Sequence, residues 1–206
     1  MSNYEDQYYI AIEPAGEDHI FPIPDQKTAD RNYEYLKLPM GEKPLFFHNS
    51  QQEKDVRRNI VRPLSDVLFD GNDLIVTDSI RNKLIQHEIN GLQLYPAVYI
   101  DDKNHWHENY WHLCFYERLN CLDKAHSSID GDIDRTKFNV EVDQFRLEKN
   151  VLDAITEEKR LLFKISGVSM GYIFVHQLIV DFFEKNNLSG IRFFKVVDFE
   201  EGDQFP

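Results

Sequence analysis

Histidines are the first candidates for chemistry in this sequence. His105 and His107 alternate around Trp106, and His112 follows in the same segment. Alternate residues of a strand lie on one face, so two imidazoles at this spacing can share a metal ion. No cysteine or carboxylate at a suitable spacing completes such a site, and the HExxH pattern is missing. We therefore interpret residues 101–104 as a surface turn followed by aromatic anchors, and we expect no metal.

Alternating acidic residues form a second candidate. Asp130, Asp132 and Asp134 imitate the first ligands of a calcium loop, and Glu141 falls where the last ligand would be. However, Arg135 stands where the sharp turn requires glycine, and no helical pattern flanks the loop. We interpret this stretch as a solvated acidic loop. It is the first candidate for a surface that meets a basic partner.

Catalytic motifs provide no third candidate. The sequence contains no GxSxG elbow, P-loop, GxGxxG or DxDxE-type cluster. Ser166 and Ser169 lie in a loop-like segment in which no general base is placed beside them. Dispersed catalytic residues escape such patterns, so an enzyme stays an open alternative. The sequence favours a protein that binds without catalysis and uses no cofactor.

Composition narrows the class of protein. The chain has 206 residues, 42% of them hydrophobic, which suffices for one large domain or two small lobes. A net charge of −13 disfavours nucleic acid and anionic membranes and suits a basic protein partner, although it also serves solubility. The sequence shows no membrane-spanning run and no signal-peptide pattern, and Cys114 and Cys121 make no disulfide framework. We expect a cytoplasmic protein.

Two strand–helix–strand units with the same spacing must position any site. They span about residues 74–98 and 172–197, and equivalent positions lie 99 residues apart. The matched pairs include Val76 and Val175, Ile80 and Ile179, Leu84 and Phe183, Gly91 and Gly190, and Leu94 and Phe193. Each glycine is predicted to end its helix. The pattern favours duplication or pseudo-symmetry over two unrelated units.

These elements predict an α+β fold with mixed, mostly antiparallel sheet and short helices. Helices at about 78–88 and 177–187 are expected to cover one sheet face through Ile80, Leu84, Ile179 and Phe183. Further buried side chains are expected at Leu94, Leu113, Phe115, Phe163 and Phe193. Residues 1–64, punctuated by prolines, form an N-terminal region of unclear role, and residues 65–206 contain the units. One continuous domain is the alternative.

The part of the chain from about residue 65 to 200 resembles a known family. It is similar to bacterial immunity proteins whose genes lie beside polymorphic, contact-delivered toxins. The similarity rests on the first unit with Asn90-Gly91-Leu92, the Tyr110-Trp111 strand, the strands Phe145–Leu147 and Leu162–Ile165, and the closing Ser189-Gly190-Ile191-Arg192-Phe193. The resemblance implies a cytoplasmic protein that binds a cognate toxin and blocks it.

The sequence therefore predicts a non-enzymatic immunity protein, with a basic effector domain such as a nuclease as its expected toxin. A tight inhibitor needs aromatic anchors and complementary charge. After the acidic loop, Trp106, Tyr110 and Trp111 are the second candidates for the interface. The alternatives are a general interaction or scaffold module and an enzyme with a dispersed site. Neither nucleic acid nor a membrane is an expected partner, and the oligomeric state is left open.

Overall fold

Two sheets organise the chain. The computed structural model describes residues 3–129 and 139–205. The larger sheet contains β2 (Pro22–Pro24), β3 (Leu45–Asn49), β4 (Val67–Asp70), β5 (Asp73–Thr77), β6 (Leu92–Ile100) and β7 (Trp106–Phe115), in the order β2-β3-β6-β7-β5-β4. The smaller sheet contains β1 (Tyr8–Ile12), β10 (Leu162–Lys164), β11 (Ile173–His176) and β12 (Arg192–Lys195), in the order β10-β11-β1-β12. A short pair joins β8 (Ser128–Ile129) to β9 (Val142–Gln144).

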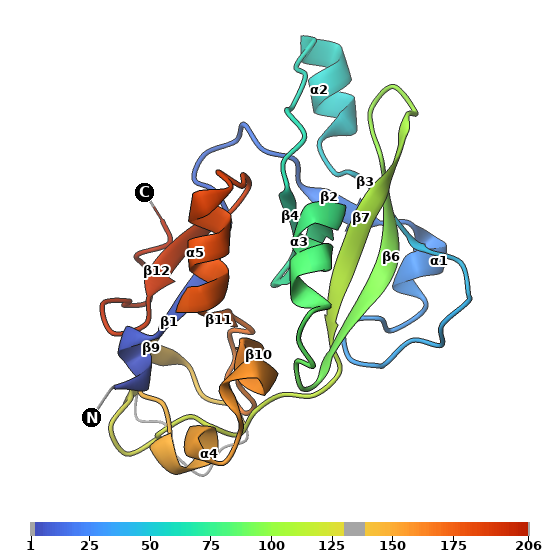
Figure 1. Ribbon diagram of the computed structural model, residues 1–206. Helices are drawn as coiled ribbons and strands as arrows, with labels where there is room; N and C mark the ends of the chain where they lie inside the picture. The colour runs from blue at the N-terminus through green and yellow to red at the C-terminus, as the bar shows by residue number, and fades with distance from the viewer. Residues whose placement is uncertain (1–2, 130–138, 206) are drawn as a thin grey trace.

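The helices are short, as predicted. They are α1 (Gln26–Ala29), α2 (Gln52–Arg58), α3 (Asp78–Leu84), α4 (Lys149–Asp153) and α5 (Gln177–Lys185), with 3₁₀ turns at Tyr4–Asp6 and Glu157–Arg160. Among the paired strands described, only β3 and β6 run parallel as neighbours. These features confirm the predicted mixed, mostly antiparallel α+β fold (Figure 1). In the described part of the chain, no helix is both long and apolar enough to cross a bilayer.

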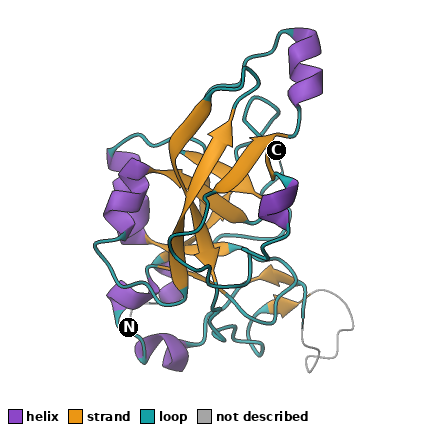
Figure 2. Cartoon of the chain, turned by 90° about the vertical axis from the view of Figure 1, so that its right-hand side faces the viewer, coloured by secondary structure: helices purple, strands orange, loops and turns teal. Residues whose placement is uncertain are grey.

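A shared core holds the two sheets together. Both α3 and α5 lie on the same side of the strands (Figure 2). Ile80, Leu84, Ile179 and Phe183 are all buried in one cluster, as predicted, together with apolar side chains from both sheets. The opposite face of each sheet packs on a cluster of its own. We call β2–β7 with α1–α3 the six-stranded lobe, and the smaller sheet with α5 the four-stranded lobe.

The two lobes share one topology. In the six-stranded lobe β7 lies antiparallel between β5 and β6, and in the four-stranded lobe β1 lies antiparallel between β11 and β12. The outer strands β4 and β10 pair in the same way with β5 and β11. The predicted pair of units is therefore confirmed, and each unit has a third strand inserted between its two parallel strands. In the four-stranded lobe this strand comes from the N-terminal end of the chain.

The register of the strands agrees as well. Val76 pairs with Trp111, and its equivalent Val175 pairs with Tyr9. The next residues along, Tyr110 and Tyr8, are both buried. The Tyr110 hydroxyl donates to the Ser65 carbonyl at 2.7 Å, and the Tyr8 hydroxyl donates to the Arg160 carbonyl at 3.0 Å. Both carbonyls lie just before the equivalent strands β4 and β10, so the repeat extends to single hydrogen bonds.

Both glycines of the repeat have a role other than the predicted one. The helices end at Leu84 and Lys185, well before Gly91 and Gly190. Asn187, with φ 51°, takes the left-handed position after α5. Gly190 has φ 89°, and a Cβ there would collide with the carbonyl oxygen of Val67. The glycines therefore permit close approach to a neighbouring segment rather than ending a helix.

Burial of the remaining predicted core residues is mostly as expected. Leu113, Phe115 and Phe163 are buried. Leu94 and Phe193 are only partly buried, although both pack against the shared core. They occupy equivalent positions on β6 and β12. The prediction that these two side chains are fully buried was therefore wrong.

Residues 1–64 do not form a separate unit. β1 is an inner strand of the smaller sheet, and β3 pairs with β6 in the larger one. Residues 1–64 therefore contribute strands to both sheets. β3 and part of residues 55–64 lie beside residues 97–109, the part of the β6–β7 hairpin that has no equivalent in the four-stranded lobe. Arg31 and Leu38 bond instead to Tyr95 and Gln93, which precede that part. We call residues 97–109 the hairpin extension and, together with residues 20–64, the elaborated end.

Candidate interaction surface

Internal comparison of the lobes points to the elaborated end. β12 ends at Lys195, the equivalent of Pro96, and β1 begins at Tyr8, the equivalent of Tyr110. β6 and β7 continue past those points, and the residues of β6 that pair with β3 all lie in the continuation, from Ala97 to Ile100. Features that both lobes share are needed for the fold. Those present only at the elaborated end are the better candidates for function.

A bulge sets which side chains the hairpin extension presents. Ile100 pairs with Trp106 and Pro96 pairs with Trp111, with a register shift between Ala97 and Tyr99. The shift inserts one extra residue into β7, so both tryptophans fall on the same face of the sheet. They are the two tryptophans of the sequence. Their common face is the one that carries α3.

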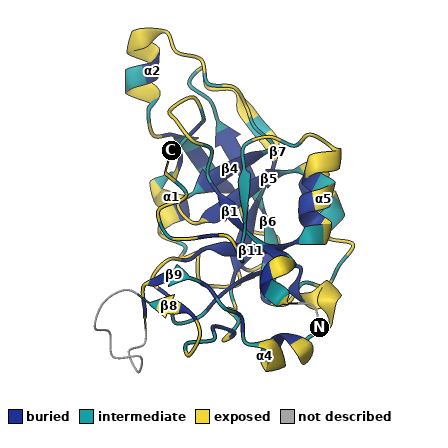
Figure 3. Ribbon diagram, turned by 90° about the vertical axis from the view of Figure 1, so that its left-hand side faces the viewer, coloured by how far each residue is buried: buried dark blue, intermediate teal, exposed yellow. Residues whose placement is uncertain are grey.

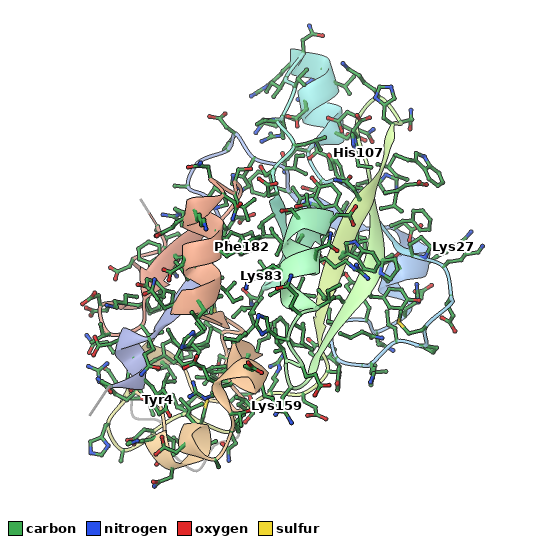
Figure 4. All side chains as sticks on the ribbon, in the orientation of Figure 1. Tyr4, Lys27, Lys83, His107, Lys159 and Phe182 are labelled. Atoms are coloured by element: carbon green, nitrogen blue, oxygen red, sulfur yellow. The ribbon has the colours of Figure 1, made fainter. Side chains whose placement is uncertain are left out.

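Trp106 is the exposed member of this pair. Its side chain is 58% exposed and meets the Phe46 ring edge-on, with the centroids 5.6 Å apart. The two rings line a broad hollow of about 980 Å³, the tryptophan hollow, with Ile100 beside them and with charged rim residues on α1 and in the segment before β3. Lys27, on that rim, points away from the body of the protein (Figure 4). Trp106 is therefore suited to anchor a partner.

Trp111 has a structural task. Its Nε1 donates to the Asp78 carboxylate at 2.7 Å, at the first residue of α3, and the Arg81 guanidinium stacks 4.2 Å from its ring centroid. The four-stranded lobe has the same device: the Tyr9 hydroxyl donates to Gln177 at 2.5 Å, at the first residue of α5. Because both lobes pin a helix to the central strand in this way, we assign Trp111 to the scaffold.

Tyr110 belongs to the core. It is 2% exposed, and its hydroxyl is used by the bond to Ser65. Burial raises the pKa of this phenol to about 12. A side chain in this position cannot contact a partner without unfolding β7, so of the three predicted aromatic anchors only Trp106 lies fully at the surface.

A second hollow lies on the other side of the hairpin extension. α2 and the segment after it project from the body of the protein, beside the hairpin turn (Figures 1 and 3). Their exposed aliphatic side chains are Val56 (59% exposed), Ile60, Val61 (77% exposed) and Leu64. These side chains and the turn residues Asp101 and Asp102 line a hollow of about 410 Å³, which we call the tip hollow. Contiguous exposed aliphatics of this kind mark interaction sites.

Buried polar groups hold the tip in place. The Arg62 guanidinium forms a two-pronged ion pair with the Asp55 carboxylate, and both side chains are almost fully buried. Arg62 also donates to the carbonyls of Glu17 and His19. The bond from Arg62 holds the pKa of Asp55 below its usual range. Since burying an ion pair contributes little net stability, its task here is to fix the projecting segment.

The predicted histidine pair lies at the same end. Asp101 Oδ2 is 3.2 Å from both His105 Nδ1 and His107 Nε2. Burial alone would raise the pKa of Asp101, but bonds from the His105 and Lys103 amides and from the two imidazoles outweigh it and lower that pKa to about 2. His107 lies near the upper end of the hairpin, below α2 (Figure 4). Within the described residues, no set of three or more ligand side chains is arranged to hold a metal.

His112 lies apart from them, inside the six-stranded lobe. It is fully buried, with Nε2 3.4 Å from Asp70 Oδ2 and Nδ1 3.3 Å from Cys114 Sγ. The Tyr33 hydroxyl donates to the same Asp70 oxygen at 2.7 Å. Burial would lower the pKa of His112, but Asp70 and Cys114 raise it to about 10. Because the His112 side chain is closed off from solvent, it is a core feature.

The acidic loop is the first predicted contact surface. Asp130, Asp132 and Asp134 lie outside the described residues, so their role at an interface stays a prediction. Sequence reasoning missed the tip hollow altogether. The available signal was a group of aliphatic residues among arginines: Val56, Ile60, Val61 and Leu64. Their spacing does not form the continuous apolar stripe of a helix that packs on a core.

Comparison with known protein families identifies the family of the chain. The model of the Immunity protein family (Imm11) matches residues 5–198. The chain belongs to this immunity protein family, and the resemblance predicted from residues 65–200 is confirmed and extended to the N-terminal strand. A search of curated proteins gives no match. The family implies a cognate toxin as partner.

Proposed function

We propose that this protein neutralises a cognate bacterial toxin in the cytoplasm by binding it, without catalysis of its own. The family match over residues 5–198 carries the proposal. The net charge of −13 supports a basic effector domain, such as a nuclease, as the toxin, because opposite charges speed encounter. The two cysteines are free and buried, which suits a reducing compartment.

The elaborated end is the proposed contact surface. Trp106 supplies an exposed aromatic anchor, and the tryptophan hollow beside it offers space for a partner side chain. The acidic loop with Asp130, Asp132 and Asp134 is proposed as a steering element. Replacing these three residues with lysine is expected to slow association with a basic toxin and to leave the fold intact.

Co-expression tests the proposal. The chain is produced together with the toxic C-terminal domain of the large secreted protein encoded beside its gene, and cell survival is measured. We expect the native protein to protect and the purified pair to form a stable complex. Failure to protect against every neighbouring toxin domain would contradict the proposed function. A catalytically inactive toxin variant serves as the partner in binding assays.

A further inference from the structure

The tip hollow combines apolar walls with a carboxylate that has no cationic partner within the described part of the chain. Its walls are the aliphatic side chains of Val56, Ile60, Val61 and Leu64, and Asp102 lies at its edge on the hairpin turn. Asp102 is only partly exposed. Among residues 3–129 and 139–205, the donor that reaches its carboxylate is the Asn49 amide, at 3.1 and 3.3 Å.

The buried cation at this end of the molecule, the Arg62 guanidinium, does not pair with Asp102. Asn49 donates to Asp55 at 2.9 Å as well as to Asp102, so two carboxylates share one amide. Arg62 directs its guanidinium to Asp55 and to backbone carbonyls. Lys103 also borders the hollow, but within the described residues it forms no ion pair with Asp102. Asp102 therefore lines the hollow without an ion pair of its own among the residues that the structure describes.

We propose that the tip hollow binds an arginine side chain of the toxin. The guanidinium would pair with Asp102, and the aliphatic stem would pack on Val56 and Val61. Arginine fits better than lysine because its weakly hydrated, planar head loses less on leaving water beside apolar walls. The buried Asp55–Arg62 pair fixes these walls before binding, so little ordering cost is incurred on association. This proposal rests on the proposed function for the identity of the partner.

A small-molecule probe tests the hollow without any toxin. We expect n-butylguanidinium, at millimolar concentration, to shift the methyl NMR signals of Val56, Ile60 and Val61, and n-butylurea, its neutral counterpart, to shift them far less. Asp102→Asn should abolish the difference between the two probes. Glu53→Gln, which removes an equal charge from α2 outside the hollow, should leave it intact. Equal shifts from both probes, or no shift from either, would overturn the proposal.

The toxin complex provides the second test. With the neighbour-encoded toxin domain, Asp102→Asn and Val61→Ser are each expected to weaken binding about tenfold or more. Glu184→Gln, which removes an equal charge from an exposed position of α5 outside the elaborated end, should have little effect. If the native protein binds the toxin and both tip variants bind equally well, the arginine proposal is wrong and the proposed function stands. If no toxin domain binds while the probe still selects Asp102, the proposed function fails and the hollow keeps its specificity for a guanidinium.

Discussion

The two lobes pair their strands alike and differ in what surrounds those strands. In the four-stranded lobe, Ile10 occupies the position that His112 takes in the other lobe, and Lys164 occupies that of Phe69. The backbone register is therefore compatible with very different side chains. What both lobes retain is a buried tyrosine on the central strand and a hydrogen bond from that strand to the start of a helix.

This difference separates scaffold from surface within a single chain. A repeated contact has been kept at two places with unlike neighbours, so it serves the fold. The hairpin extension, α2 and Trp106 occur once, and α2 projects from the body of the protein (Figure 3). The predictions below test this separation.

The largest effect is expected from the repeated glycines. Gly190→Ala would drive a Cβ into the Val67 carbonyl of the other lobe at a φ of 89°, and should lower the free energy of unfolding by roughly 2–4 kcal/mol. Gly91→Ala should cost only about 1–2 kcal/mol, because the Cβ would meet Glu117, which lies in an exposed loop. Urea unfolding measures both. Equal losses would show that the inter-lobe contact at Gly190 is not tight.

Replacing each of the two repeated tyrosines with phenylalanine should lower the free energy of unfolding, and by more at Tyr8 than at Tyr110. Tyr8→Phe removes the bond to the Arg160 carbonyl and also the acceptor for Arg160 Nη1 at 2.6 Å. It should cost roughly 2–3 kcal/mol, since a buried guanidinium loses a partner. Tyr110→Phe removes only the bond to Ser65 and should cost about 1 kcal/mol. Thermal and urea unfolding compare the two, and a larger loss for Tyr110→Phe would contradict the assignment.

The His112 position should give the two lobes different pH behaviour. Because Asp70 and Cys114 raise the pKa of His112 from 6.5 to about 10, its protonated form contributes stability in full below pH 6.5, and that contribution is lost as the pH rises toward 10. The double variant His112→Ile with Asp70→Asn copies the apolar residue of the four-stranded lobe. It should unfold with a flatter pH dependence above neutrality. A slope equal to that of the native protein would argue against the ion pair.

The repeat could be predicted from sequence because its apolar spacing is local. Val76, Ile80 and Leu84 recur in type and spacing at Val175, Ile179 and Phe183, and burial of one face explains that pattern. The strand at Tyr8–Ile12 could be predicted from its apolar run, but its place in the sheet could not, because β1 reaches that place through pairing with segments far along the chain. The burial of Tyr110 could not be predicted for the same reason: it depends on Ser65 and on the long-range packing of β7.

The tip hollow escaped prediction because its parts are distant in sequence. Val61 and Asp102 come together only when α2 is fixed by the Asp55–Arg62 pair beside the hairpin turn. Neither an arginine nor an aspartate in a polar segment signals such a pair. Contacts of this kind follow from tertiary structure and not from periodicity.

The smallest effect on stability, and the sharpest test of the comparison, is expected from the tryptophans. Trp111→Phe loses the bond to Asp78 and should destabilise the fold by about 1 kcal/mol without changing toxin binding. Trp106→Ala should alter stability by less than about 0.5 kcal/mol, because its side chain is mostly exposed. It should nevertheless weaken toxin binding about tenfold, as loss of an anchor does. Unfolding curves and titration of the toxin complex measure the two quantities separately. If Trp111→Phe weakened binding more than Trp106→Ala, repetition within the fold would no longer distinguish scaffold residues from binding residues.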